Sequence, residues 1–210
     1  MLQQQTAKIP GTQGYAEHAA ALIPQYELIP FTEHHQPELH LLPTVPSRIL
    51  DIGAGTGLDA AWFAEQGHSV LAVEPTAEFL AAAMRLHPSP LIEWLDDALP
   101  GLEAVMGLGQ RFDVVMLSAV WMHLDEAERR IAMPRVASLL APGGVMVLSL
   151  RHGPVPAGRR MFDVSGEETE ELARQHGVVT VLNTRTGSLQ AGNRAAGVTW
   201  TRLAFRHVSQ

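Results

Sequence analysis

The chain has 210 residues, enough for one domain of ordinary size with a short appendage. Hydrophobic residues make up 46% of it and charged residues 18%, so the chain can bury a large core, and general disorder is excluded. The absence of cysteine excludes a disulfide framework, thiolate-bound zinc and a cysteine nucleophile. The formal net charge of -7 argues against a broad phosphate-binding surface, so we expect no nucleic-acid partner.

The sequence shows no sign of membrane insertion or export. No apolar run approaches the roughly 20 residues of a membrane span. The first residues, MLQQQTAKIPG, lack the charged-then-apolar pattern of a signal peptide. We therefore expect a cytoplasmic protein without a membrane partner, present as a monomer or a homodimer.

Proline is frequent in the first part of the chain, up to Pro46. Short helical patterns lie between these prolines, over residues 15–25 and 32–42, because proline keeps helices short. Residues 1–46 are too few to form an independent domain. We predict that they form a helical lid segment on a main domain of residues 47–210.

From Arg48 onward, short apolar runs alternate with helical patterns. This alternation predicts an α/β fold whose mostly parallel sheet is covered on both faces. In the last strand the alternation changes phase, which predicts a bulge near Thr201 and Arg202. Strands are expected at 48–52, 69–73, 91–95, 112–117, 145–150, 178–182 and 198–206, and helices at 58–66, 76–86, 125–140 (kinked or split at Pro134) and 167–176.

Polar and glycine residues follow the first two strands at the edge where open parallel sheets bind ligands. The first strand leads into Asp51-Ile52-Gly53-Ala54-Gly55-Thr56-Gly57, and glycines let backbone amides approach a ligand. Glu74 follows the second strand, 21 residues after Gly53, a spacing that suits a carboxylate binding both ribose hydroxyls. The pattern predicts a nucleoside site.

The spacing of the glycines indicates which class of nucleoside cofactor the site could bind. A dinucleotide fingerprint requires glycine or alanine where this chain has Leu58, and no phosphate-loop lysine follows the glycines. The spacing is instead G-x-G-x-G, preceded by Asp51. A nicotinamide-dependent oxidoreductase is thus disfavoured by Leu58 but stays open as an alternative.

From about Arg48 to Arg206 the chain resembles the class I S-adenosylmethionine-dependent methyltransferases. The resemblance implies a Rossmann-like, doubly wound seven-stranded sheet in which residues 198–206 form the one antiparallel strand. The motifs that carry it are Leu50-Asp51-Ile52-Gly53-Ala54-Gly55-Thr56-Gly57, Val73-Glu74-Pro75, Leu95-Asp96-Asp97-Ala98-Leu99-Pro100, Phe112-Asp113-Val114-Val115 and Leu140-Ala141-Pro142-Gly143-Gly144.

The resemblance also implies cofactor contacts for S-adenosylmethionine. Gly53, Ala54 and Gly55 would lie against the methionine part, and Asp51 would help to hold its amino group. Gly57 is also expected among the cofactor-binding residues. Glu74 would bind the ribose hydroxyls, and Ser118 would lie near the sulfonium. The adenine contacts would come from Pro75, the amide of Ala98, and Asp97 or its neighbour Asp96, with Asp97 favoured by register.

His123 is the candidate general base, because it follows the fourth strand at the mouth of the cleft and its pKa range suits proton transfer. The alternative is a histidine that braces the helix starting at Asp125. Arg151 and His152 follow the fifth strand and could bind a carboxylate or phosphate of the acceptor, or simply be solvated. Tyr15 and Trp121 could wall the acceptor pocket or pack in the core. No histidine set has metal-ligand spacing, so we expect no metal.

Within the resembled family, several acceptors are disfavoured. Ser118-Ala119-Val120-Trp121 is unlike the Asn/Asp-Pro-Pro-aromatic motif that usually accompanies methylation of nucleic-acid or amide nitrogen. Carbon-five methylation of pyrimidines needs a cysteine, and metal-dependent catechol methylation needs acidic ligands where Ser118 stands. We expect methyl transfer to the oxygen or nitrogen of a small molecule. A non-catalytic S-adenosylmethionine-binding regulator or scaffold remains the other alternative.

Overall fold

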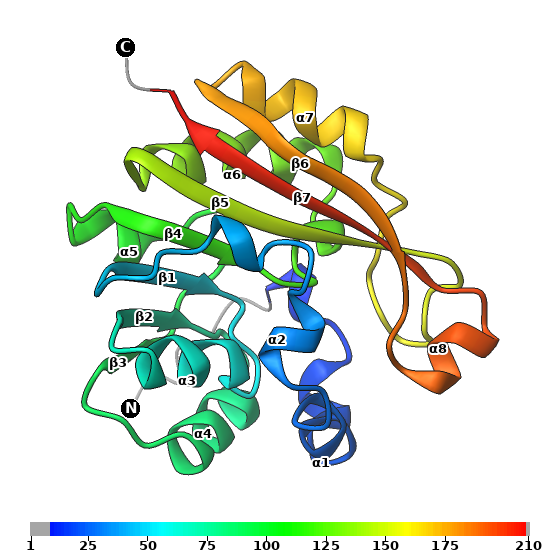
Figure 1. Cartoon of the computed structure of the whole chain (residues 1–210). Coiled ribbons are helices and arrows are strands. Elements are labelled where there is room, and N and C mark those ends of the chain that lie inside the picture. The colour runs from blue at the N-terminus through cyan, green and yellow to red at the C-terminus, as the bar shows by residue number, and fades with distance from the viewer. Residues whose placement is uncertain (1–8, 209–210) are drawn as a thin grey trace, which may run out of the picture.

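The computed structural model describes residues 9–208, so residues 1–8 of the predicted lid segment lie outside the described residues (Figure 1). One seven-stranded sheet has the order β3-β2-β1-β4-β5-β7-β6. Neighbouring pairs from β3 to β5 are parallel, whereas β7 is antiparallel to both β5 and β6. This confirms the predicted fold class. The strands are β1 Arg48–Ile52, β2 Ser69–Val73, β3 Ile92–Leu95, β4 Phe112–Leu117, β5 Leu140–His152, β6 Val178–Gly187 and β7 Thr199–His207.

Helices cover both faces of the sheet, and α1 and α2 (blue in Figure 1) lie beside α4 and α3. Among the described residues, no helix is long and apolar enough to cross a membrane. The α-helices are α1 Tyr15–Tyr26, α2 Phe31–His34, α3 Leu58–Glu65, α4 Ala77–Leu86, α5 Glu103–Gly107, α6 Glu126–Ser138, α7 Gly166–Arg174 and α8 Ala191–Ala195, and short 3₁₀ turns span Pro10–Thr12, Leu39–Leu41 and Trp121–His123.

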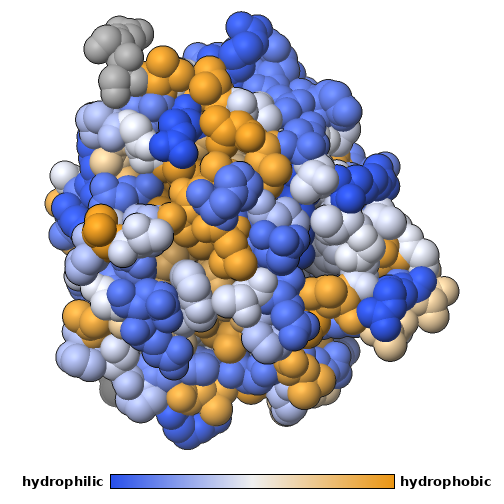
Figure 2. Space-filling model, viewed as in Figure 1, coloured by the Kyte–Doolittle hydropathy of each residue, from blue (hydrophilic) through white to orange (hydrophobic). Residues whose placement is uncertain are grey.

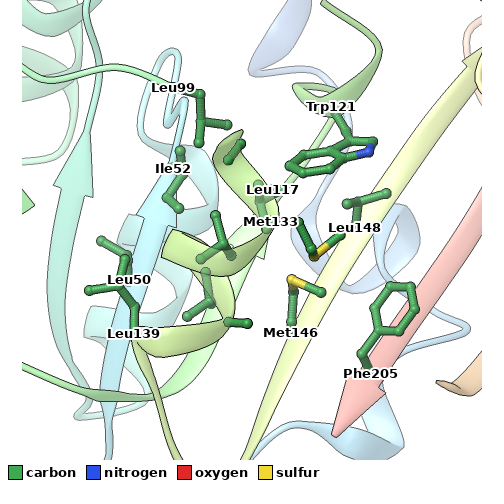
Figure 3. Packing of buried hydrophobic residues seen from close by; sticks show 14 of the residues in the cluster. Leu50, Ile52, Leu99, Leu117, Trp121, Met133, Leu139, Met146, Leu148 and Phe205 are labelled. Carbon is green, nitrogen blue, oxygen red and sulfur yellow. The ribbon is translucent and has the colours of Figure 1, made fainter. Parts of the chain in front are cut away.

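Two buried apolar clusters hold these layers together. One joins the sheet to α5, α6 and α7 and includes Leu50, Met133 and Leu148 (Figure 3). The other joins the opposite face to α2 and α3 through Phe31 and Phe63. Because β1 and β4 are buried on both faces, they are nearly continuous apolar runs, which is why their bounds follow from the sequence. The outside is largely hydrophilic, with an apolar band down the middle of the face in Figure 2.

Several element predictions need correction. β5 and β6 are longer than expected. β7 pairs with β6 along its whole length and with β5 to its end at His152, while the start of β5 pairs with β4 through Leu140 and Phe112. The bulge lies in β6, between Thr180 and Leu182, while β7 runs in regular register with β5. The phase change in β7 has another cause, since helices and the N-terminal segment cover both of its faces and residues 201–205 are all buried.

The observed helices also differ in detail from the expected ones. α6 continues through Pro134, held by buried neighbours such as Met133 and Val136, and a capping box between Asp125 and Glu128 starts it. The pattern over 32–42 forms α2 and a 3₁₀ turn rather than one helix. The short helices α5 and α8 were not predicted.

Candidate functional site

A cavity of about 470 Å³ lies where the glycine turn after β1 meets the ends of β2, β3, β4, β5 and β7. The N-terminal segment closes one side of it, and the β6–β7 connection forms another wall. The charged residues that line it come from different elements. Its carboxylates come from β1, α3 and the ends of β2 and β3, whereas two arginines come from β5 and β7 and a third, Arg159, from the loop after β5. We call the carboxylates the acidic end (Asp51, Asp59, Glu74 and Asp97) and the two strand arginines the basic end (Arg151 and Arg202).

Asp51 is the last residue but one of β1 and is 1% exposed. Its Oδ2 has no hydrogen-bond partner among the described residues. Burial raises the pKa of Asp51, and the nearby carboxylates of Asp59 and Glu74 raise it further. An unpartnered buried carboxylate is costly, so this atom is suited to receive a cationic N–H donor.

Glu74, at the end of β2, is held in place by backbone amides. Its Oε2 accepts the Gly55 N–H at 2.9 Å, and its Oε1 accepts the Thr76 N–H at 2.7 Å. Burial raises the pKa of Glu74, and these hydrogen bonds oppose the rise. The carboxylate is therefore fixed at the wall of the cavity before any ligand binds.

The glycine turn has two different requirements. Gly53 lines the cavity with a φ of 73°, and a Cβ there would lie 2.5 Å from a Val120 methyl, so only glycine fits. Gly57 also has a positive φ, but its missing Cβ makes room for Trp94, and Gly57 does not line the cavity. The expectation of a cofactor contact at Gly57 is corrected, because Gly57 serves the packing of the helix start.

After β3, the two aspartates differ. Asp97 lines the cavity, and its oxygens accept the amides of Ala98, Ala104 and Val105 at 2.7–3.0 Å. Asp97 thereby fixes the start of α5. Asp96 is exposed and lies outside the cavity lining, so the structure removes it from the candidate site.

Ser118 belongs to a cluster that the sequence did not reveal. Its Oγ donates to Asp59 Oδ2 at 2.8 Å, and His35 Nε2 lies 2.9 Å from the same oxygen. Burial alone would raise the pKa of Asp59, but His35 and Ser118 lower it overall. Asp59 in the first turn of α3 resembles an ordinary helix-dipole residue, and nothing in the sequence pairs it with a histidine 24 positions earlier. The cluster fastens the N-terminal segment to the cavity.

His123 is 6% exposed, lines the cavity and uses both ring nitrogens. Nδ1 lies 2.7 Å from the carbonyl oxygen of Arg160, and Nε2 lies 3.0 Å from the Tyr15 hydroxyl. Because a carbonyl can only accept, Nδ1 carries the proton and the Tyr15 hydroxyl donates to Nε2. Burial lowers the pKa of His123, which keeps the ring neutral near pH 7. Burial also raises the pKa of Tyr15.

Two residues expected in the acceptor pocket lie elsewhere. Trp121 is fully buried in the core beside Leu148 and does not line the cavity (Figure 3). Arg151 lines the cavity, but the alternation of β5 turns the next residue to the opposite face. There His152 Nε2 lies 2.8 Å from Thr201 Oγ1, and Nδ1 lies 3.3 Å from Asp163. Both expectations are corrected.

The β6–β7 connection supplies cavity walls that sequence reasoning missed. The expected sixth strand ended too early for its connection to reach the site. The lining residues from the connection are Ser188, Leu189, Gln190 and Asn193.

Tyr26 of α1 also lines the cavity and stacks on Phe79. Within residues 9–208, no group of three or more His, Asp and Glu residues could hold a metal ion.

Comparisons with known proteins agree with this geometry. Residues 49–144 match the family model described as a methyltransferase domain. The chain is 29% identical over 157 residues to glycine N-methyltransferase of Mus musculus, covering 65% of this chain and 52% of that protein. It is 35% identical over 102 residues to the ubiquinone biosynthesis O-methyltransferase of Nitrobacter winogradskyi, covering 49% and 38%. The chain thus spans about half the length, or less, of these curated relatives.

Among solved structures, the fold is similar to that of the N-methyltransferase NodS from Bradyrhizobium japonicum WM9 in complex with S-adenosyl-L-homocysteine. The TM-score is 0.70 at 17% identity, over 92% of this chain and 98% of that chain. The cavity here fits such a ligand, because Asp51 offers an unpartnered buried oxygen and Glu74 a fixed carboxylate. The chain is therefore similar to methyltransferases in sequence over residues 49–144 and in fold over most of its length.

Proposed function

We propose that the protein is an enzyme that methylates a small-molecule acceptor at oxygen or nitrogen and releases S-adenosylhomocysteine. The observation that carries the proposal is the acidic end of the cavity, where Asp51 Oδ2 is buried without a partner beside the fixed Glu74 carboxylate. The named activities of the glycine and ubiquinone-pathway relatives support the same reaction class.

In this proposal the acidic end binds S-adenosylmethionine, which when bound supplies a methyl group activated by a sulfonium. Asp51 holds the amino group and Glu74 binds the ribose hydroxyls. Pro75, Asp97 and Ala98 lie against the adenine, while Gly53, Ala54, Gly55 and Ser118 line the methionine part. Since the donor is activated, the protein has mainly to align the two reactants and exclude water.

We assign proton removal from the acceptor to His123, reached through Tyr15. As the acceptor loses its proton to the Tyr15 oxygen, the Tyr15 proton passes to His123 Nε2 along the observed 3.0 Å contact. The Arg160 carbonyl steadies the imidazolium that results, through its bond to Nδ1. An acceptor that attacks as a free amine would not need this step.

The first test is calorimetric titration with S-adenosylhomocysteine and, separately, NADH. Binding of S-adenosylhomocysteine alone is expected, whereas tight binding of NADH alone would favour the oxidoreductase alternative and refute the proposal. The second test incubates the protein with methyl-labelled S-adenosylmethionine and a metabolite extract. Label is expected in a small molecule. Cofactor binding without any transfer would favour the regulator or scaffold alternative.

Further sequence-based predictions belong to this proposal. Residues 1–46 act as a lid, which α1 supports by contributing Tyr15 and Tyr26 to the cavity wall. We also propose a cytoplasmic monomer or homodimer without a nucleic-acid partner, in keeping with the net charge of -7. Light scattering and nucleic-acid binding assays would test the last two points.

A further inference from the structure

Arg202 of β7 lies at the basic end with unused hydrogen-bonding capacity. Its side chain is 4% exposed and lines the cavity. Its Nε and Nη1 have no hydrogen-bond partner among the described residues. Glu38 is fully buried behind it, with 3.8 Å between Oε1 and Nη1, which is too long for a hydrogen bond. Buried donors of this kind are costly when unpaired, so the site favours a ligand that accepts from them.

Strand register places Arg151 next to Arg202. Arg151 of β5 pairs with Trp200 of β7, and Ser149 pairs with Arg202. Residues two apart in a strand share a face, so both arginines project from the same face of neighbouring strands. Arg151 also lines the cavity, where its Nη1 donates to the Pro154 carbonyl at 2.7 Å. The two guanidinium groups therefore lie along the same part of the cavity wall.

The carboxylates nearest to Arg151 and Arg202 decide how these arginines face the cavity. Of the described residues that line the cavity, every Asp and Glu belongs to the acidic end. Glu38 offsets one positive charge but does not itself line the cavity. Asp59 also acts on Arg202 electrostatically, although its oxygen is occupied by His35 and Ser118. The basic end thus presents guanidinium N–H donors to the cavity, among them the unpartnered Nε and Nη1 of Arg202.

We infer that the acceptor is a small molecule bearing a carboxylate or phosphate, and that Arg202, together with Arg151, binds this group. The inference rests on the proposed function and names the substrate class for it. A planar guanidinium matches the oxygens of either group, whereas a neutral acceptor would leave the buried Nε and Nη1 of Arg202 unsatisfied. Because one cavity of about 470 Å³ must hold both reactants, the acceptor is small.

The test uses the full chain saturated with S-adenosylhomocysteine. Calorimetric titrations compare benzoate and acetate with the neutral amides benzamide and acetamide, and inorganic phosphate serves as a separate arm. At least one anion is expected to bind, ten-fold or more tightly than the neutral amides, and the arm that binds distinguishes carboxylate from phosphate. If no anion binds, or if the amides bind equally well, the inference is wrong.

Variants assign the binding to Arg202. Removing Arg202 alone would leave Glu38 buried and unpaired, so the test variant is Arg202→Met with Glu38→Gln. We expect at least ten-fold weaker anion binding with unchanged affinity for S-adenosylhomocysteine. Glu38→Gln alone should bind the anion at least as tightly as the wild type. Arg206→Met is the matched control, because Arg206 is an exposed arginine on the same face of β7.

The outcomes separate the two proposals. If the double variant keeps its anion affinity, Arg202 is not the anion site. If it loses affinity for S-adenosylhomocysteine instead, Arg202 belongs to the cofactor site, and the inference also fails. If the wild type does not bind S-adenosylhomocysteine at all, the proposed function itself fails.

Discussion

Both oxygens of Glu74 are already hydrogen-bonded to backbone amides, so little reorganisation is needed when a ribose reaches them. We expect Glu74→Ala to weaken binding of S-adenosylhomocysteine by about 100-fold or more, because hydrogen bonds to a charged group contribute about 1.5–3 kcal/mol each. Calorimetry measures the change. Glu93→Ala, at an exposed position of β3, is the control and should bind normally. Unchanged affinity in Glu74→Ala would remove the ribose assignment.

The proposed role of His123 is in the reaction step, whereas that of Glu74 is in cofactor binding. With an acceptor from the labelling experiment that must lose a proton to react, His123→Asn should lower kcat by about 100-fold or more, the usual contribution of a general base. Affinity for S-adenosylhomocysteine should stay within about two-fold, since no cofactor contact is removed. Tyr15→Phe should lower kcat as well. If His123→Asn keeps its kcat, the histidine only braces the neighbouring loop.

At the scale of elements, α1 is held over the cavity by aromatic and cationic contacts. The Arg159 guanidinium lies 3.6 Å from the centre of the Tyr15 ring, and Tyr26 stacks on Phe79. Removing the first contact with Arg159→Ala should destabilise α1 locally by about 0.5–1 kcal/mol. Faster amide hydrogen exchange within Tyr15–Tyr26 is the expected readout. The control variant Arg174→Ala, at an exposed position of α7, should leave that exchange unchanged. If Arg159→Ala also leaves it unchanged, the contact does not stabilise α1.

The bounds of strands buried on both faces could be predicted closely from the sequence, whereas those of elements at the edge of the sheet could not. The apolar runs of β1, β2 and β4 have the expected bounds, because all but one residue of each strand is buried between helices on each side and the sequence is correspondingly apolar. β6 lies at the edge of the sheet, where most side chains are exposed, so the second half of the strand has no apolar pattern. α8 is too short for helical periodicity to show.

The whole molecule should lose stability in mild acid, and His34 is one cause. Burial is the main reason that the pKa of His34 falls to about 4, from an ordinary 6.5. Between these values the unfolded chain binds a proton that the folded chain does not, so the free energy of unfolding decreases as pH falls. Below about pH 4 both states are protonated and the loss is complete.

Urea unfolding at about pH 7 and about pH 5 tests this dependence. The wild type should lose more stability than His34→Gln over that interval, by about 1–2 kcal/mol. His40→Gln, at an exposed position, is the control and should behave as the wild type. Equal losses in the wild type and His34→Gln would show that His34 is not buried in its neutral form.

The site was predictable only where it follows from topology. Parallel strands end at one edge, so Asp51, Glu74 and Asp97 could be placed together from their positions in the chain. Asp59 and Arg202 could not, because their partners His35 and Glu38 lie far away in sequence and no motif links them. The sequence also does not show which face of a strand end meets the cavity, and this explains the error at His152.

β7 follows β6 in the chain but lies between β5 and β6 in the sheet, and within residues 9–208 it is the only hydrogen-bonded neighbour of β6. During synthesis the earlier strands can assemble from the N-terminus, yet β6 has nothing to join until Thr199–His207 has emerged from the ribosome. The same nine residues carry Arg202. A nascent chain therefore completes its sheet and the basic end of its cavity in a single late step, and until then it exposes a strand edge that chaperones or other chains can bind.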